Sequence, residues 1–153
     1  VALIYRQQQK MSLWLTLDAL TPLFAVFALG LGLAHLASGG AFGKETSLPW
    51  GMDLWGTTRH PSQIYEILAS LLIIGLLWFQ KADSYLGVHF LTFAALTSGT
   101  RLFLEAFRGD STLIFGGLRA AQMVAWIVLA LSLFLLDRAS KNYSKEMATR
   151  NDG

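Results

Sequence analysis

The chain has 153 residues, of which 54% are hydrophobic and only 14% are charged. Soluble domains carry about 25% charged residues, so this composition excludes an ordinary soluble domain and indicates an integral membrane protein. The absence of cysteine excludes disulfides, thiolate metal sites and a cysteine nucleophile. Three histidines without ligand spacing and a dispersed net charge of +2 lead us to expect no metal, no cofactor and no nucleic-acid partner.

Four apolar segments are long enough to cross a bilayer, which takes about 17–25 residues. They run approximately over residues 13–37, 63–80, 86–107 and 113–136. The predicted fold is all-α: a polytopic membrane protein with a transmembrane domain over residues 1–137 and a polar tail over 138–153, which we expect to be frayed. Residues 1–10 look like the last turn of a helix leaving the membrane. This is either a short N-terminal anchor or the end of an upstream helix, and the sequence leaves both open.

The distribution of cationic residues predicts the orientation of these helices. With Arg6 and Lys10 in the cytoplasm, four spans return the C-terminal tail and its basic residues to the cytoplasm as well. The remaining cationic residues fall on the outer side or in the outer part of a span: Lys44, Arg59, Arg101, Arg108 and Arg119. The connection over about 38–61 faces outward too, and its many glycines with Trp50 and Trp55 predict a compact loop at the membrane surface.

An octapeptide with the sequence RHPSQIYE, at residues 59–66, stands at the start of the second span. Its polar side chains lie beside unpaired backbone N–H groups at a helix N-terminus, where anions bind readily. The simpler interpretation is a capped helix start with an interfacial tyrosine and an arginine that reaches toward water. The residues alone do not decide between the two.

Inside the third span, Arg101 and Glu105 are spaced i, i+4 and can pair on one helix face, with Arg108 about one turn further. A buried ionisable side chain costs roughly 2.5–3.5 kcal/mol on insertion scales, so such residues pair or serve a function. The pair is either self-neutralising and structural, or its guanidinium holds a lipid phosphate while Glu105 orients it or acts as a base. His35, near the outer end of the first span, is by itself more typical of an interface histidine than of a catalytic base.

These residues resemble the bacterial prolipoprotein diacylglyceryl transferase family. RHPSQIYE at 59–66 is similar to a signature of that family, and TRLFLEAFR at 100–108 resembles its R-x-x-x-E-x-x-R segment. GGAFGKETSLPWG at 39–51 and Leu17-Asp18-Ala19 with Pro22 also fit, in the family's order and spacing. The resemblance covers most of the chain.

The resemblance implies a multi-pass protein of the bacterial inner membrane, with an outward-facing active site and a cytoplasmic C-terminus. It implies transfer of diacylglycerol from phosphatidylglycerol to the lipobox cysteine thiol of a prolipoprotein signal peptide, among membrane lipids. The residues that it assigns to catalysis are Arg101, Glu105 and His60. Those that it assigns to substrate binding are Arg59, Gln63, Tyr65, Glu66, Gly43, His35 and Arg108.

The chain also departs from the family pattern. Where an arginine and an Asn or Cys are expected before the glycine-rich turn, residues 32–39 have the sequence GLAHLASG, and the family's upstream His-Gly-Gly helices are absent. Two functions therefore stay open. One is a divergent transferase, with a further membrane chain or upstream segment supplying the missing helices. The other is a catalytically inactive membrane subunit, derived from the family, that binds phospholipid within a larger complex.

Overall fold

The computed structural model describes residues 12–80, 85–109, 113–114 and 118–151. Four long helices dominate it: α2 (Leu13–Ser38), α3 (Ser62–Phe79), α4 (Val88–Glu105) and α5 (Ala120–Asn151). Two antiparallel hairpins complete it, one of β1 (Met52–Leu54) with β2 (Thr57–Arg59), the other of β3 (Leu113–Ile114) with β4 (Leu118–Arg119). The all-α class is thus confirmed. The predicted helix end over residues 1–10 lies outside the described residues.

The first three predicted helices begin and end within about two residues of α2, α3 and α4. The fourth prediction was wrong at both ends. Its first residues belong to the β3–β4 hairpin, and the helix starts only at Ala120. The tail that we expected to be frayed continues α5 to Asn151, helped by the i, i+4 pair of Asp137 and Lys141 at 2.7 Å.

Among the described residues, α2, α3 and α5 are each long and apolar enough to cross a membrane. Their outward surfaces carry large apolar side chains: Phe27 is 69% exposed, Trp78 84% and Phe79 86%. Apolar surface on this scale requires a lipid environment, so the chain is a membrane protein. The 18-residue α4 contains Arg101 and Glu105 and is less apolar, and that it spans the bilayer stays a prediction.

The helices pack through small and hydroxyl side chains, as is usual where a hydrophobic driving force between helices is missing. A Cβ on Gly32 of α2 would lie 3.1 Å from Ile67 Cγ1 of α3, so these two helices approach closely there. Asp18, within α2, accepts hydrogen bonds from the backbone N–H groups of Gly87 and Phe90, the latter at 2.9 Å, and so caps the start of α4. A carboxylate of one helix therefore fixes the N-terminus of another.

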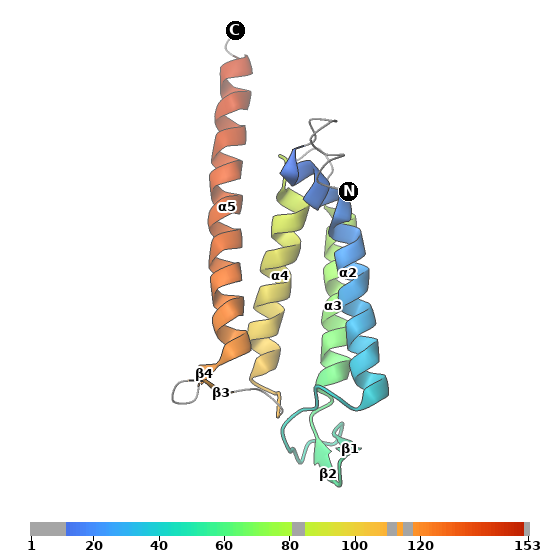
Figure 1. The fold of residues 1–153 in the computed structure, drawn as a ribbon. Coiled ribbons are helices and arrows are strands. Elements are labelled where there is room, and N and C mark those ends of the chain that lie inside the picture. The colour runs from blue at the N-terminus through green and yellow to red at the C-terminus, as the bar shows by residue number, and fades with distance from the viewer. Residues whose placement is uncertain (1–11, 81–84, 110–112, 115–117, 152–153) are drawn as a thin grey trace.

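One end of the bundle collects the elements that matter for the site (Figure 1). The connection between α2 and α3 with its β1–β2 hairpin, the end of α4, the β3–β4 hairpin and the start of α5 all lie at the lower end of the view. The C-terminus lies at the opposite end, where α5 extends beyond its neighbours. Segments that are far apart in sequence are thereby brought to one end of the molecule.

The connection over residues 39–61 is tied to that end by backbone hydrogen bonds. Gly39, with φ +67°, ends α2 in the left-handed conformation that glycine adopts without strain. Lys44 N donates to Phe107 O at 2.8 Å, and Gly109 N donates to Phe42 O at 3.0 Å. The loop is consequently a fixed part of the structure and is joined to the end of α4.

Candidate functional site: a charged cluster above an apolar cavity

A cavity of about 580 Å³ lies among α2, α3, α4 and α5. That volume is within the range of ligand-binding cavities. Most of its wall is apolar and built from small or aliphatic side chains, among them Ala25, Ile73, Leu104, Val124 and Val128. Its polar part includes His35, Glu66 and Arg101. The cavity is therefore amphipathic.

The ionisable residues at this site form a charged cluster, which consists of His35, Glu66, Arg101, Glu105, Arg108 and Arg119. Glu66, in the second turn of α3, joins three of its members. Its Oε2 lies 2.9 Å from His35 Nδ1. Its Oε1 accepts hydrogen bonds from Arg101 Nη1 at 3.3 Å and from Arg108 Nη1 at 2.9 Å. One carboxylate thus connects α2, α3 and the end of α4.

Glu105, the last residue of α4, is a second carboxylate that forms ion pairs with the arginines of the cluster. It is only 1% exposed. Its Oε2 lies 3.6 Å from Arg101 Nε and 3.9 Å from Arg108 Nε. Its Oε1 lies 4.0 Å from Arg119 Nη1, which also donates to the backbone oxygen of Glu105. The predicted i, i+4 pair of Arg101 with Glu105 is present, as one contact of a larger network.

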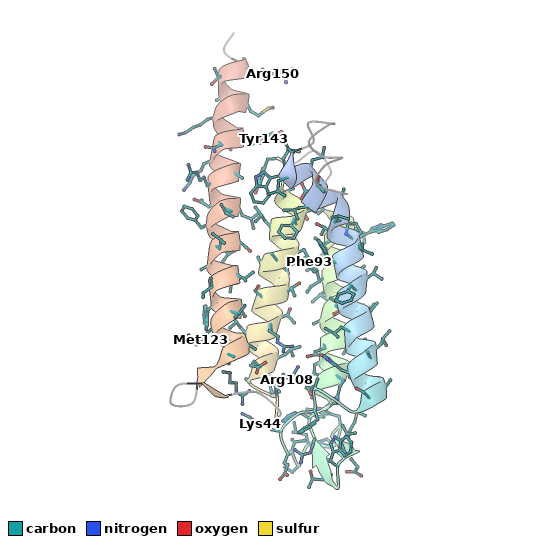
Figure 2. The ribbon with its side chains drawn as sticks, in the orientation of Figure 1. Lys44, Phe93, Arg108, Met123, Tyr143 and Arg150 are labelled. Carbon is teal, nitrogen blue, oxygen red and sulfur yellow. The ribbon has the colours of Figure 1, made fainter. Side chains whose placement is uncertain are left out.

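The three arginines differ in exposure. The Arg101 side chain is 40% exposed, against 10% for Arg108 and 16% for Arg119. Arg101 also lines the cavity, and Figure 2 labels Arg108 at the same lower end of the bundle, beyond α4. A guanidinium has five N–H donors in a planar fork that matches carboxylate and phosphate oxygens. Arg101 is therefore the arginine best placed to accept an anion entering the cavity.

A second cavity, of about 710 Å³, adjoins the first. Thr100 and Leu104 line both cavities. The second is largely aromatic, with Trp50 from the loop, His60 and Tyr65 from the octapeptide, and Phe103 and Phe107 from the end of α4.

The rings of His60, Tyr65 and Phe107 contact one another, with the His60 centroid 6.4 Å from that of Tyr65 and 5.3 Å from that of Phe107, and the latter two 6.1 Å apart. The buried Nδ1 of His60 has no hydrogen-bond partner among the residues that the structure describes. Trp50 Nε1 donates to the Tyr65 hydroxyl at 3.0 Å, which fixes the loop tryptophan against α3.

Three further candidates brace the loop and line neither cavity. The fully buried Gln63 donates from Nε2 to Gly40 O at 2.8 Å. The Arg59 guanidinium carbon lies 5.0 Å from the Phe42 ring centroid, and Arg59 Nη2 lies 3.4 Å from Glu45 Oε1. Gly43 packs so tightly on His60 that a side chain would collide with its backbone.

The ten candidate residues from the sequence thus divide into three groups. Five belong to the charged cluster, His60 and Tyr65 line the aromatic cavity, and Arg59, Gln63 and Gly43 hold the loop. The sequence analysis missed Arg119 as a member of the cluster, although its predicted place on the same side as the other arginines was a signal. It also missed the aromatic wall, because the partners of Trp50 come from two distant segments.

Fold and site together define a class: an all-α integral membrane protein with an amphipathic cavity whose polar end gathers arginines and glutamates. Residues 1–137 match the family model for prolipoprotein diacylglyceryl transferase. The chain therefore belongs to the prolipoprotein diacylglyceryl transferase family.

Individual relatives also support membership of this family. The chain is 32% identical to a phosphatidylglycerol–prolipoprotein diacylglyceryl transferase of Acaryochloris marina, over 90% of this chain and 57% of that protein. It is 27% identical to the protein of that name from Oceanobacillus iheyensis, over 94% of this chain and 55% of that protein. For the one from Clostridioides difficile the identity is 38%, over 61% of this chain and 38% of that protein. The chain spans about half the length of the curated relatives that it matches.

Proposed function

We propose that this chain forms the phospholipid-binding part of a phosphatidylglycerol–prolipoprotein diacylglyceryl transferase. The observation that carries the proposal is the charged cluster at the polar end of an apolar cavity, in a chain whose relatives bear that name. Acyl chains would occupy the apolar part, and the phosphate would lie against the arginines. Arginine suits this role because its two parallel N–H groups can hold two phosphate oxygens.

The reaction would need the arginines most at its transition state. The acceptor thiol sulfur attacks the glyceryl carbon that carries the phosphate, a C–S bond forms, and the C–O bond to phosphate breaks. The bonding electrons go to the departing oxygen, so a phosphodiester with one negative charge becomes glycerol phosphate with up to two. We assign Arg101 and Arg108 to this added charge, because preorganised donors aimed at developing charge are the strongest single source of catalysis.

The glutamates would orient these arginines. Glu66 and Glu105 each contact both Arg101 and Arg108. Two carboxylates shared between two guanidinium groups restrict their rotation, which lowers the entropy cost of binding the headgroup. His35, on Glu66, would extend the same network to α2.

His60 and Tyr65 would serve the acceptor. They line the aromatic cavity that meets the first one at Thr100 and Leu104, and an apolar wall suits the hydrophobic signal peptide of a prolipoprotein. We assign His60 to take the thiol proton, because its buried Nδ1 has no hydrogen-bond partner among the described residues and its ring lines this cavity. Arg59, Gln63 and Gly43 would keep this wall in position through the loop.

We also propose the cellular setting. The chain would be a multi-pass protein of a bacterial inner membrane, with the site on the outer side and the C-terminus in the cytoplasm, in line with the positive-inside rule. Helices outside the present sequence, in a longer polypeptide or in a further membrane chain, would complete the transferase.

A transfer assay with phosphatidylglycerol and a lipobox peptide tests the proposal. Arg101→Ala should lower turnover by about 10²–10³, the usual effect of removing one such donor. Arg138→Ala, which removes an exposed cation from α5, is the matched control and should leave turnover unchanged. The assay includes the helices that complete the transferase, and no transfer by that wild-type assembly, with phosphatidylglycerol still bound, would instead identify a catalytically inactive lipid-binding subunit.

A further inference from the structure

We propose that Arg119 is a positioning residue for the headgroup site, acting on Arg101 and Arg108 through Glu105. This inference rests on the proposed function, because it concerns the same site. Arg119 was not among the residues that the sequence assigned to catalysis or binding. It comes from β4, immediately before α5, whereas Arg101 lies in the last turns of α4 and Arg108 lies three residues beyond its end.

The contacts around Glu105 carry the argument. Its Oε2 lies 3.6 Å from Arg101 Nε and 3.9 Å from Arg108 Nε, as ion pairs without a hydrogen bond among the described residues, and its Oε1 lies 4.0 Å from Arg119 Nη1. Arg119 Nη1 also donates to the backbone oxygen of Glu105. One guanidinium nitrogen therefore binds the main chain of Glu105 and lies within ion-pair distance of its carboxylate, which favours the rotamer that keeps Oε1 toward Arg119.

Burial makes this contact consequential. Glu105 is 1% exposed, so water cannot replace a lost partner. A buried carboxylate that loses one cation turns toward those that remain. That rotation changes how Arg101 and Arg108 are held, because their Nε atoms lie 3.6 and 3.9 Å from the other oxygen. The geometry of two headgroup-binding arginines then depends on a residue of the next helix.

The position of Arg119 also connects the site to α5. The first turns of α5 supply Ala120, Ala121, Val124 and Ala125 to the wall of the apolar cavity. The Arg119–Glu105 contact fixes the start of that wall to the end of α4. A single residue thereby sets both the orientation of the cations and the place of the adjoining apolar wall.

The first test measures the affinity of the full chain for phosphatidylglycerol in detergent, by titration with a short-chain form. Arg119→Gln should weaken binding about tenfold. Arg119→Lys should stay within about threefold of the wild type, because an ammonium can still contact Oε1 and the backbone oxygen of Glu105. Arg138→Gln is the control and should bind as the wild type does. Unchanged binding by Arg119→Gln, or an equal loss in Arg119→Lys, would overturn the inference.

A second test does not depend on lipid binding. A double-mutant cycle between Arg119→Gln and Arg101→Gln, read from unfolding in detergent, should give a coupling of at least threefold in the unfolding equilibrium. That coupling should vanish in a Glu105→Gln background, because Glu105 transmits it. Coupling that persists without Glu105, or no coupling at all, would overturn the inference. A wild type that binds no phosphatidylglycerol but shows the coupling would refute only the proposed function.

Discussion

Replacement of Gly43 by alanine should separate the loop from the end of α4 and distort the site. A Cβ at Gly43 would lie 2.6 Å from the Cβ of His60 and still closer to the His60 carbonyl oxygen. Main-chain atoms cannot rotate away as the tip of a side chain can, so the backbone itself must move. The same stretch is held on both sides, by Lys44 N to Phe107 O at 2.8 Å and by His60 N to Lys44 O at 2.9 Å.

The magnitude follows from these contacts. Overpacking a well-packed interior costs typically about 1–3 kcal/mol, and each strained hydrogen bond adds about 0.5–1.5 kcal/mol. We expect Gly43→Ala to lower the free energy of unfolding by about 3 kcal/mol, which is about a hundredfold in the equilibrium constant. Because Gly43 also forms a β-bridge with Arg108, phosphatidylglycerol binding should weaken in the same variant.

Reversible unfolding by SDS from mixed micelles, followed by tryptophan fluorescence, measures this loss. Gly75→Ala is the matched control, since a Cβ at Gly75 meets nothing within 4 Å and alanine favours a helix by about 1 kcal/mol. If Gly43→Ala unfolded as the wild type does, the loop could not be the fixed element that the account requires.

Three further predictions use the same unfolding measurement. Ser62→Ala should cost about 1–3 kcal/mol, because it leaves the buried Ala41 carbonyl without the 2.6 Å bond from the Ser62 hydroxyl, whereas the exposed Ser144→Ala should be neutral. Asp18→Ala should cost about 0.5–2 kcal/mol by removing the cap of α4, and an unchanged stability would show that this cap contributes nothing. Glu66→Gln should cost about 3–5 kcal/mol, because its cationic partners lose their shared carboxylate, and a loss below 1 kcal/mol would contradict that sharing.

The sequence allowed the helices to be predicted because a bilayer demands long apolar runs with little variation in length. It also allowed the contact of Arg101 with Glu105 to be predicted, since i, i+4 spacing fixes neighbours on a helix. The helical continuation of α5 beyond residue 137 could not be predicted from polarity alone, because a polar tail favours fraying and an exposed helix equally. Charged side chains at i, i+4 support an exposed helix as well.

The assembly of the site depended on tertiary packing. Glu66 meets Arg101 and Arg108 across 35 and 42 residues, and no local pattern determines which faces of α3 and α4 adjoin. The octapeptide illustrates the limit: consecutive helical residues point about 100° apart. Tyr65 and Glu66 therefore line different cavities, although they are adjacent in the sequence.

The central claim, that the cavity beneath the charged cluster holds phosphatidylglycerol, is tested most directly by photolabelling. Phosphatidylglycerol with a diazirine on an acyl chain would be bound to the purified chain, irradiated, and the labelled peptides mapped. The account predicts label on cavity-lining residues such as Ala28, Phe93 and Val128, suppressed by unlabelled phosphatidylglycerol and reduced in Arg101→Ala. Label confined to outward-facing residues such as Phe27 and Trp78, and unaffected by competitor, would contradict it.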